Sequence, residues 1–143
     1  MTHGPTPTIS QDEAIACLDR LVDAFSRTDT DSYFGVLDPG ASFVFAGEPE
    51  PLVGRDAYRR LWEGWVASGW RVTGCDSTER RVMLAGPVAV ITHRVLTRTT
   101  GPDGEQRLDE RESVVVVRGD DGVVRVLHEH LSPTTTEEPR DDA

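Results

Sequence analysis

The last two predicted strands lie in the sequence RLDERESVVVVRGDDGVVRVLHEHLS, which covers residues 107–132. Apolar and polar side chains alternate at a period of two on both sides of Gly119-Asp-Asp-Gly122, a composition typical of a turn between two strands. We therefore predict a hairpin with strands near 106–118 and 123–132.

Two further strands precede this hairpin. The same period of two continues toward the N-terminus and is interrupted by Gly86-Pro87 and by the cluster Gly101-Pro-Asp-Gly104. These interruptions predict strands near 70–84 and 87–100. The second half of the chain is therefore predicted to be a meander of four antiparallel strands.

Helical spacing dominates the first half. Ser10-Gln-Asp-Glu13 has the pattern of a capping box, which predicts a long helix that starts there. A short helix is predicted over 30–37, a strand over 42–47, and a third helix from Gly54-Arg55-Asp56 to Gly69. This order of elements predicts an α+β domain in which a curved antiparallel sheet wraps around the helices.

The length of 143 residues accommodates one domain. We expect residues 1–9 to form a flexible lead, 10–132 the domain, and 133–143 a disordered acidic tail. The net charge of −10, without a basic stretch, argues against nucleic acid and anionic lipid as partners. No apolar run approaches the length of a membrane span, and no leader pattern precedes residue 10, so a cytoplasmic location is expected.

The two cysteines give no sign of a metal or a disulfide framework. Cys17 and Cys75 are far apart in the sequence, and neither belongs to a CxxC or CxxH motif. No cofactor is predicted. A zinc site formed by His128, His130 and His93 is a third and weaker alternative, because His-x-His on a strand points both imidazoles to one side.

The final hairpin also predicts which side chains share a face. A loop of two or four residues pairs odd positions of the first strand with even positions of the second. One face then carries Asp109, Arg111, Ser113, Val115 and Val117 with Val124, Val126, His128, His130 and Ser132. The other face carries Glu110, Glu112, Val114, Val116, Arg125, Leu127 and Glu129. We predict that the first face points inward and that the second, with its valines between charges, is a homodimer surface.

The inward face defines a candidate site at the polar end of an apolar cavity. We expect His130, His128 and Asp109 to be catalytic, and Arg111 and Ser113 to bind ligand. The alternation of Ala89, Ile91, His93 and Val95 adds His93 to the same cavity. The remaining predicted ligand-binding residues are Trp62, Trp65, Tyr58 and Phe45.

These residue types favour a particular ligand. Arg111 in a dry cavity would bind a carboxylate or an enolate, and its charge would keep His130 neutral and able to accept a proton. The expected ligand is a small apolar molecule with a carboxylate or carbonyl group. Structural alternatives remain: hydrogen-bonded core histidines, an ion pair of Arg111 with Asp109 or Glu13, and tryptophans that belong to the core.

The order of elements resembles the nuclear transport factor 2-like (NTF2-like) superfamily over about residues 10–132. The most specific motifs are Phe-Ser-Arg-Thr-Asp at 25–29, Gly54-Arg55-Asp56 leading to Trp62, and His128-Glu-His-Leu-Ser132. The last motif resembles the calcium/calmodulin-dependent kinase association domain and the SnoaL-like group close to it. This resemblance implies a cone-shaped sheet around a long N-terminal helix and two shorter ones, and a homodimer.

The resemblance implies two kinds of function. SnoaL-like cyclases move a proton with an acid on the sheet, and Asp109 is the candidate here, so a cyclase or isomerase that uses general acid–base catalysis on a carbonyl compound is expected. Leu21 and Phe45 stand where steroid isomerases have their tyrosine and aspartate, which argues against that mechanism. The alternative is a non-catalytic dimerisation or association module.

Overall fold

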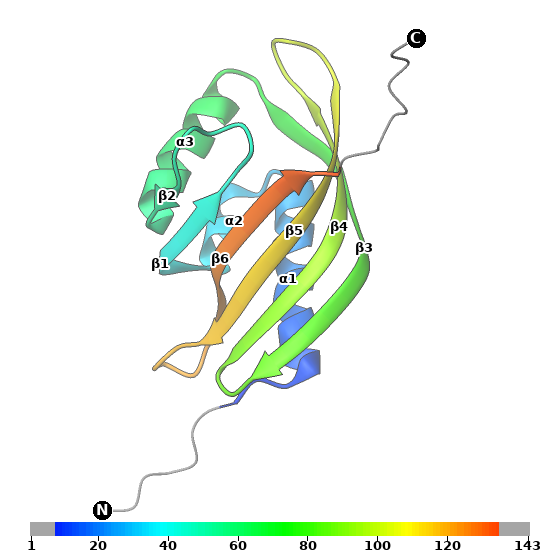
Figure 1. Ribbon diagram of the computed structural model, residues 1–143. Coiled ribbons are helices and arrows are strands. Elements are labelled where there is room, and N and C mark those ends of the chain that lie inside the picture. The colour runs from blue at the N-terminus through cyan, green and yellow to red at the C-terminus, as the bar shows by residue number, and fades with distance from the viewer. Residues whose placement is uncertain (1–7, 135–143) are drawn as a thin grey trace, which may run out of the picture.

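The computed structural model describes residues 8–134 and has the predicted α+β architecture (Figure 1). Six strands form one sheet in the order β2-β1-β6-β5-β4-β3, in which only β1 and β6 run parallel. In chain order the elements are α1 (Gln11–Ser26), α2 (Thr30–Gly35), β1 (Leu37–Val44), β2 (Leu52–Val53), α3 (Arg55–Ala67), β3 (Arg71–Ala85), β4 (Val88–Thr100), β5 (Gln106–Arg118) and β6 (Val124–Pro133).

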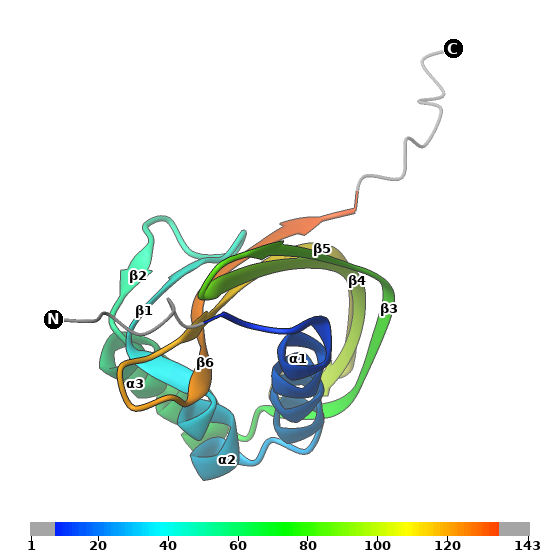
Figure 2. The same ribbon diagram turned by 90° about the horizontal axis from the view of Figure 1, so that it is seen from below.

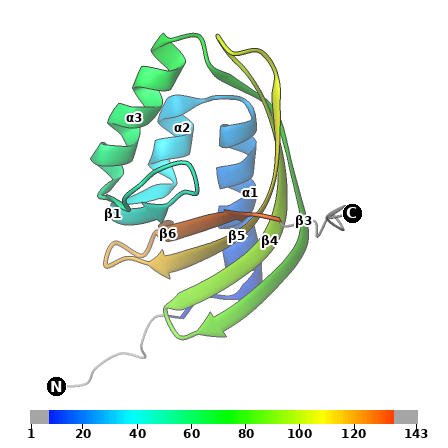
Figure 3. The same ribbon diagram turned by 45° about the horizontal axis from the view of Figure 1, so that its top comes forward.

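The sheet curves around α1 and leaves all three helices on its concave side (Figures 2 and 3). The long strands β3, β4 and β5 form the curved wall, and α3 lies across the shorter β1 and β2 (Figure 2). No helix among residues 8–134 combines the length and apolar character that a membrane span requires. The fold prediction is therefore confirmed as an α+β domain with a curved, unclosed sheet.

The capping box at the start of α1 forms as expected. The Glu13 amide donates to Ser10 Oγ at 3.1 Å, and the Ser10 amide donates to the Glu13 carboxylate at 3.0 Å. Arg118 at the end of β5 also binds Glu13, and it donates to the Thr8 carbonyl. Ile9 is buried in the core, although it was predicted to belong to the flexible lead at 1–9. Residues 1–7 of that lead and residues 135–143 of the predicted tail at 133–143 lie outside the described residues.

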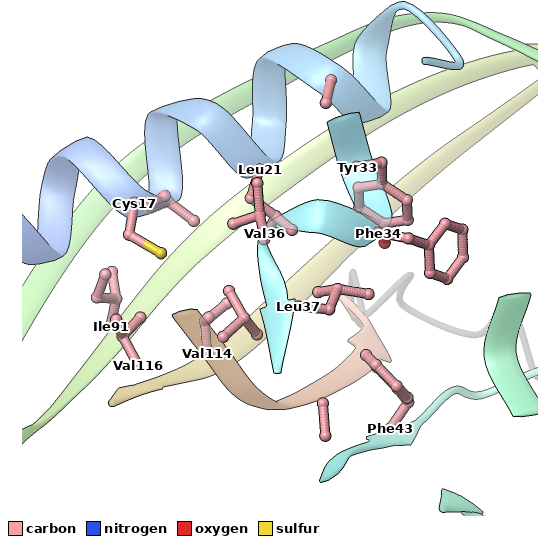
Figure 4. Packing of buried hydrophobic residues seen from close by; sticks show 14 of the residues in the cluster. Cys17, Leu21, Tyr33, Phe34, Val36, Leu37, Phe43, Ile91, Val114 and Val116 are labelled. Atoms are coloured by element: carbon pink, nitrogen blue, oxygen red, sulfur yellow. The ribbon is translucent and has the colours of Figure 1, made fainter. Parts of the chain in front are cut away.

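The core fills the space between α1 and the concave face of the sheet (Figure 4). Ile91 of β4 and Val114 and Val116 of β5 are fully buried and point toward Cys17 of α1 (Figure 4). Strand β1 starts at Leu37 rather than at the predicted residue 42. Its pairing with β6 is irregular between Leu37 and Ser42, so the predicted turn residues Asp38-Pro39-Gly40 form a bulge inside the strand.

The hairpin of β5 and β6 departs from the predicted register in two places. Its connection has five residues, Gly119–Val123, so Val116 pairs with Val126 and even positions face even positions. Beyond Val126 the extra residue Leu127 forms a bulge, after which Val115 pairs with His128. These two differences cancel, so Arg111, Ser113, His128 and His130 do share a face.

That shared face is the outer one, which corrects the prediction that it lines the interior. Val114, Val116 and Glu112 of β5 are buried, whereas Arg111 and Ser113 are exposed. On β6 the inward residues are Val126 and Glu129. Valine occupies all four positions 114–117, so the apolar pattern does not distinguish the two faces of β5. The inner face also carries glutamates, which are usually found on an outer face.

Candidate functional site

A cavity of about 410 Å³ lies between the helices and the inner face of β3–β6. This volume suits a small organic molecule. Its walls are mainly aromatic and aliphatic, and its polar groups come from the sheet, from two tyrosines and from Glu48 in the loop between β1 and β2. The apolar lining includes Leu21, Val22, Phe25, Phe45, Trp65, Trp70, Val95, Leu108 and Leu131; the polar groups are Tyr33, Tyr58, Glu48, Cys75, His93, Thr97, Thr99, Gln106, Glu110, Glu112 and Glu129.

Three ionisable side chains from neighbouring strands form the polar centre of this cavity. His93 of β4 places Nε2 2.6 Å from Oε1 of Glu112 on β5. Glu129 of β6 lies beside Glu112, and its Oε2 has no hydrogen-bond partner within residues 8–134. All three side chains are buried. An unpartnered buried carboxyl oxygen in a cavity wall is costly in the empty protein and available to a ligand.

Burial displaces the pKa values of this group. It raises the pKa of Glu112 to about 7, and burial together with the Glu112 charge raises the pKa of Glu129 well above its ordinary value. Burial and then the Arg80 guanidinium lower the pKa of His93 to about 4, so the imidazole is neutral near pH 7. The two carboxyls titrate as a pair that shares at least one proton at neutral pH, which provides an acid and a base side by side.

Two buried tyrosines complete the polar surface. The hydroxyls of Tyr33 on α2 and Tyr58 on α3 lie 2.9 Å apart, and the ring centroids are 5.9 Å apart. Burial and the Glu129 charge raise the pKa of both phenols well above the ordinary value. Both therefore keep their protons, and because only one donates to the other, one O–H remains free to bind a ligand oxygen.

Four predicted ligand-binding residues do line this cavity. They are His93, Tyr58, Trp65 and Phe45. Trp62 does not, because it is fully buried in the core with Nε1 donating to Thr30 Oγ1 at 2.9 Å. The prediction that Trp62 contacts ligand is corrected: its position two turns into α3 directs the ring between α1 and α2, where it packs against Phe25 and Tyr33.

The other predicted residues lie on the outer face of the sheet, away from the cavity. Asp109 forms an ion pair with Arg94, with Nε and Oδ1 2.9 Å apart, and His128 shares a 2.8 Å hydrogen bond with Ser42. Arg111, Ser113 and His130 line a second hollow, on that face. The prediction that His130, His128 and Asp109 lie in the cavity as catalytic residues is therefore wrong. The prediction that Arg111 and Ser113 bind ligand in the cavity is wrong for the same reason.

The histidine metal site does not form. His93 is buried and pairs with the inward Glu112, while His128 and His130 pair with Val115 and Ser113 of the outer face, so the three imidazoles do not point to the same side of the sheet. Within the part of the chain that the structure describes, no group of three potential ligands is arranged to hold a metal ion.

Sequence reasoning missed the carboxyl groups of Glu110, Glu112 and Glu129. All three were assigned to the outer face because they share a face of the hairpin that lies opposite Arg111, Ser113, His128 and His130, the residues predicted to point inward. One signal was available: His93 was placed inward by its own strand, and Glu112 is its direct partner on β5. A regular antiparallel pair faces the same side, so an inward His93 requires an inward Glu112.

Cys75 offers a test of the cavity wall. Burial raises the pKa of the Cys75 thiol to about 11, and that of Cys17 likewise. At pH 8 the thiolate fraction is then about 100-fold lower than in an unfolded chain, so alkylation by iodoacetamide should be slower by that factor. Mass spectrometry of the folded and urea-unfolded protein measures both rates. Equal rates at Cys75 would contradict this environment.

Comparison with known proteins agrees with the geometry. Residues 15–136 match the family model of the SnoaL-like domain, and the chain belongs to this family. No curated protein matches. Among solved structures, a protein of the cystatin-like fold from Caulobacter vibrioides is similar, with 17% identity, TM-score 0.73, and coverage of 92% of this chain and 94% of that one.

Two other solved structures share the fold. An NTF2-like protein of unknown function from Pseudomonas putida has 23% identity and TM-score 0.69, with 89% of each chain covered. The CaMKII hub of S. rosetta has 17% identity and TM-score 0.70, covering 94% of this chain and 100% of that one. These similarities show a shared fold, and membership of the SnoaL-like family rests on the match over residues 15–136.

Proposed function

We propose that this SnoaL-like domain binds a small, mainly apolar carbonyl compound and moves a proton within it by general acid–base catalysis. The observation that carries the proposal is the pair of adjoining buried carboxyls, Glu112 and Glu129, in the wall of an apolar cavity. Two carboxyls in one site ionise at different pH values, and a base is most effective when its pKa lies near the working pH. The pKa of Glu112, at about 7, meets that condition.

The charge of the cavity restricts the ligand to a neutral carbonyl compound. Four glutamates line the cavity, and neither arginine nor lysine does. A carboxylate ligand would meet repulsion with no cation to offset it. The expected carboxylate partner of Arg111 is therefore dropped, since that guanidinium lies outside.

The step balances without a cofactor. The Glu112 carboxylate takes a proton from the carbon beside the carbonyl, and the C–H electron pair becomes the carbon–carbon double bond of an enolate. The protonated Glu129, with a free tyrosine hydroxyl, hydrogen-bonds the developing oxyanion. Where the compound carries a β,γ carbon–carbon double bond, the enolate is a dienolate, so Glu112 returns the proton to the γ-carbon, the double bond moves to the α,β position and the carbonyl re-forms. The net result is an isomerisation, and both glutamates end in their initial states.

Hydrogen exchange tests this proposal before the natural substrate is known. In D₂O at pH 7, the protein should accelerate exchange at the α-carbon of 1-indanone, followed by proton NMR. Glu112→Gln should lower the rate by about 10²- to 10⁴-fold, the usual contribution of a general base. Arg111→Ala is the matched control on the same strand and should retain the rate. Equal exchange by wild type and Glu112→Gln would overturn the assignment.

A second candidate function is association of two copies through the outer face of the sheet. Val90, Val115 and Val117 are only half-buried there, and Met83, the partner of Val90 on β3, is exposed beside them. An apolar strip of this kind is typical of an interface, and the similarity to a hub structure supports it. The surface differs from the predicted one, since Val114 and Val116 are in the core. Sedimentation of wild type and Met83→Glu tests it, with a dimer expected only for the wild type.

A further inference from the structure

A chain of hydrogen bonds runs from the cavity wall to the surface of α1. Nδ1 of His93 lies 2.6 Å from Ser77 Oγ on β3. Arg80 Nε donates to the same Ser77 oxygen at 2.9 Å, and Arg80 Nη1 donates to Asp19 of α1 at 2.6 Å. His93 is buried, Arg80 is one-quarter exposed and Asp19 is more than half exposed. The buried imidazole is thus connected to a charged pair at the surface.

A distortion of β3 makes this connection possible. The pairing of β3 with β4 is irregular between Thr78 and Arg81, where the two residues Glu79 and Arg80 stand opposite the single residue His93. Glu79 has φ of 56°, in the left-handed region that non-glycine residues seldom occupy. In a regular strand, Ser77 and Arg80 would point to opposite faces. The bulge brings both to the side of α1, and such local strain is often found next to functional groups.

The hydrogen bonds select one tautomer of His93. Arg80 can only donate, so Ser77 Oγ accepts from it and keeps its own hydroxyl proton for another acceptor. Nδ1 of His93 is the acceptor within reach, at 2.6 Å. Nδ1 then carries no proton, and Nε2–H donates to Oε1 of Glu112. With Nε2 protonated, His93 favours the ionised form of Glu112, while Glu129 receives no such donor.

We infer that Ser77, oriented by Arg80 and Asp19, is a positioning residue that holds His93 in the Nε2–H tautomer and so makes Glu112 the base and Glu129 the acid. The inference rests on the proposed function for its catalytic meaning. The tautomer itself is a property of the empty protein. Ser77 does not line the cavity, yet it decides which carboxyl of the pair is the base and which is the acid.

The charged and titratable groups around His93 come from several elements. Glu112 and Glu110 face it from β5, and Glu129 from β6. Arg80 and Cys75 approach from β3, and Asp19 of α1 acts through Arg80. Tyr33 and Tyr58 complete the set from the helices. Among these groups only Arg80 is a cation, and its charge lowers the pKa of His93.

Nitrogen-15 NMR of the histidine rings tests this inference without any substrate. His93→Gln identifies the His93 signals among those of the four histidines by their loss. In the wild type at pH 7 we expect the proton on Nε2 and none on Nδ1. In Ser77→Ala the tautomer ratio should fall about fivefold, which corresponds to one ordinary hydrogen bond. Ser77→Thr retains the hydroxyl and is the matched control, with no change expected.

Arg80→Gln provides a second measurement that does not depend on the folding of the serine variant. Loss of the guanidinium should raise the pH at which His93 gains its second proton, and it should also mix the tautomers. A wild-type proton on Nδ1, or a ratio unaffected by both Ser77→Ala and Arg80→Gln, would overturn the inference. If exchange of 1-indanone fails in the wild type while the tautomer shifts as expected, the proposed function fails and the positioning role stands.

Discussion

Glu129→Gln is expected to make the protein more stable than wild type above pH 7, by a margin that grows with pH. Burial and Glu112 raise the pKa of Glu129 well above its ordinary value, so the folded protein keeps a proton that the unfolded chain has lost. Wherever the folded state binds more protons, the free energy of unfolding falls as pH rises, by up to about 1.4 kcal/mol per pH unit for one proton. Glutamine is neutral and does not titrate.

The neighbouring groups act in a lower pH window. Glu112 also lowers the free energy of unfolding as the pH rises toward 7, because its pKa is about 7 in the folded protein. His93 contributes to stability with the opposite sign. Its pKa is about 4 in the folded protein, so when the pH falls below the ordinary pKa of histidine the unfolded chain binds this proton first, and the free energy of unfolding falls. These two contributions largely offset one another between about pH 5 and 7. The Glu129 effect is therefore clearest from pH 7 upward.

Urea unfolding of wild type and Glu129→Gln between pH 6 and 9 measures the effect. Glu105→Gln, on the exposed loop between β4 and β5, is the matched control and should have the wild-type slope with pH. Parallel curves for wild type and Glu129→Gln across this range would show that Glu129 ionises in the folded protein as it does in water.

Trp62→Ala is expected to cost about 3–5 kcal/mol of unfolding free energy, the usual range for a fully buried large aromatic side chain. The Trp62 ring is 0% exposed and packs among Phe25, Tyr33, Phe34 and Tyr58. A typical domain has only about 5–15 kcal/mol in total, so the variant should unfold at markedly lower temperature and urea concentration.

Trp65→Ala is the matched comparison, because it lies one turn further along α3 and lines the cavity. It is partly exposed, so a smaller loss of stability is expected, together with weaker binding of 1-indanone. Urea unfolding and thermal shift with and without the ketone separate the two effects. Equal losses of stability in the two variants would contradict the division into a core tryptophan and a cavity tryptophan.

The order of elements was predictable because each signal in the sequence is local. The capping box at Ser10 and the glycine clusters near 86, 101 and 119 depend only on neighbouring residues, and they place α1 and the four long strands within a few residues. The start of β1 was missed because Asp38-Pro39-Gly40 has turn composition, and only its pairing with β6 makes it part of a strand.

The site was predictable only where one face of a strand was clearly apolar. Ala89, Ile91 and Val95 surround His93 on one side of β4, and the structure places His93 in the cavity as expected. On β5 the run of four valines fits either face, so the sequence grouped the side chains of this strand into two faces correctly but did not determine which face the sheet turns inward. Buried glutamates form the polar centre of the cavity, whereas carboxylates are generally exposed to water.

The bulge at Leu127 also bears on how this family can diversify. If Leu127 paired with Val115 and the bulge were absent, β6 would alternate regularly beyond Val126, turning His128 and His130 toward the interior and Glu129 toward solvent. A one-residue shift in the pairing of the closing strand can thus exchange carboxyls for imidazoles as the ionisable lining. Descendants of one ancestor can acquire different proton-carrying groups by gaining or losing such a bulge, with every amino acid around the cavity inherited unchanged.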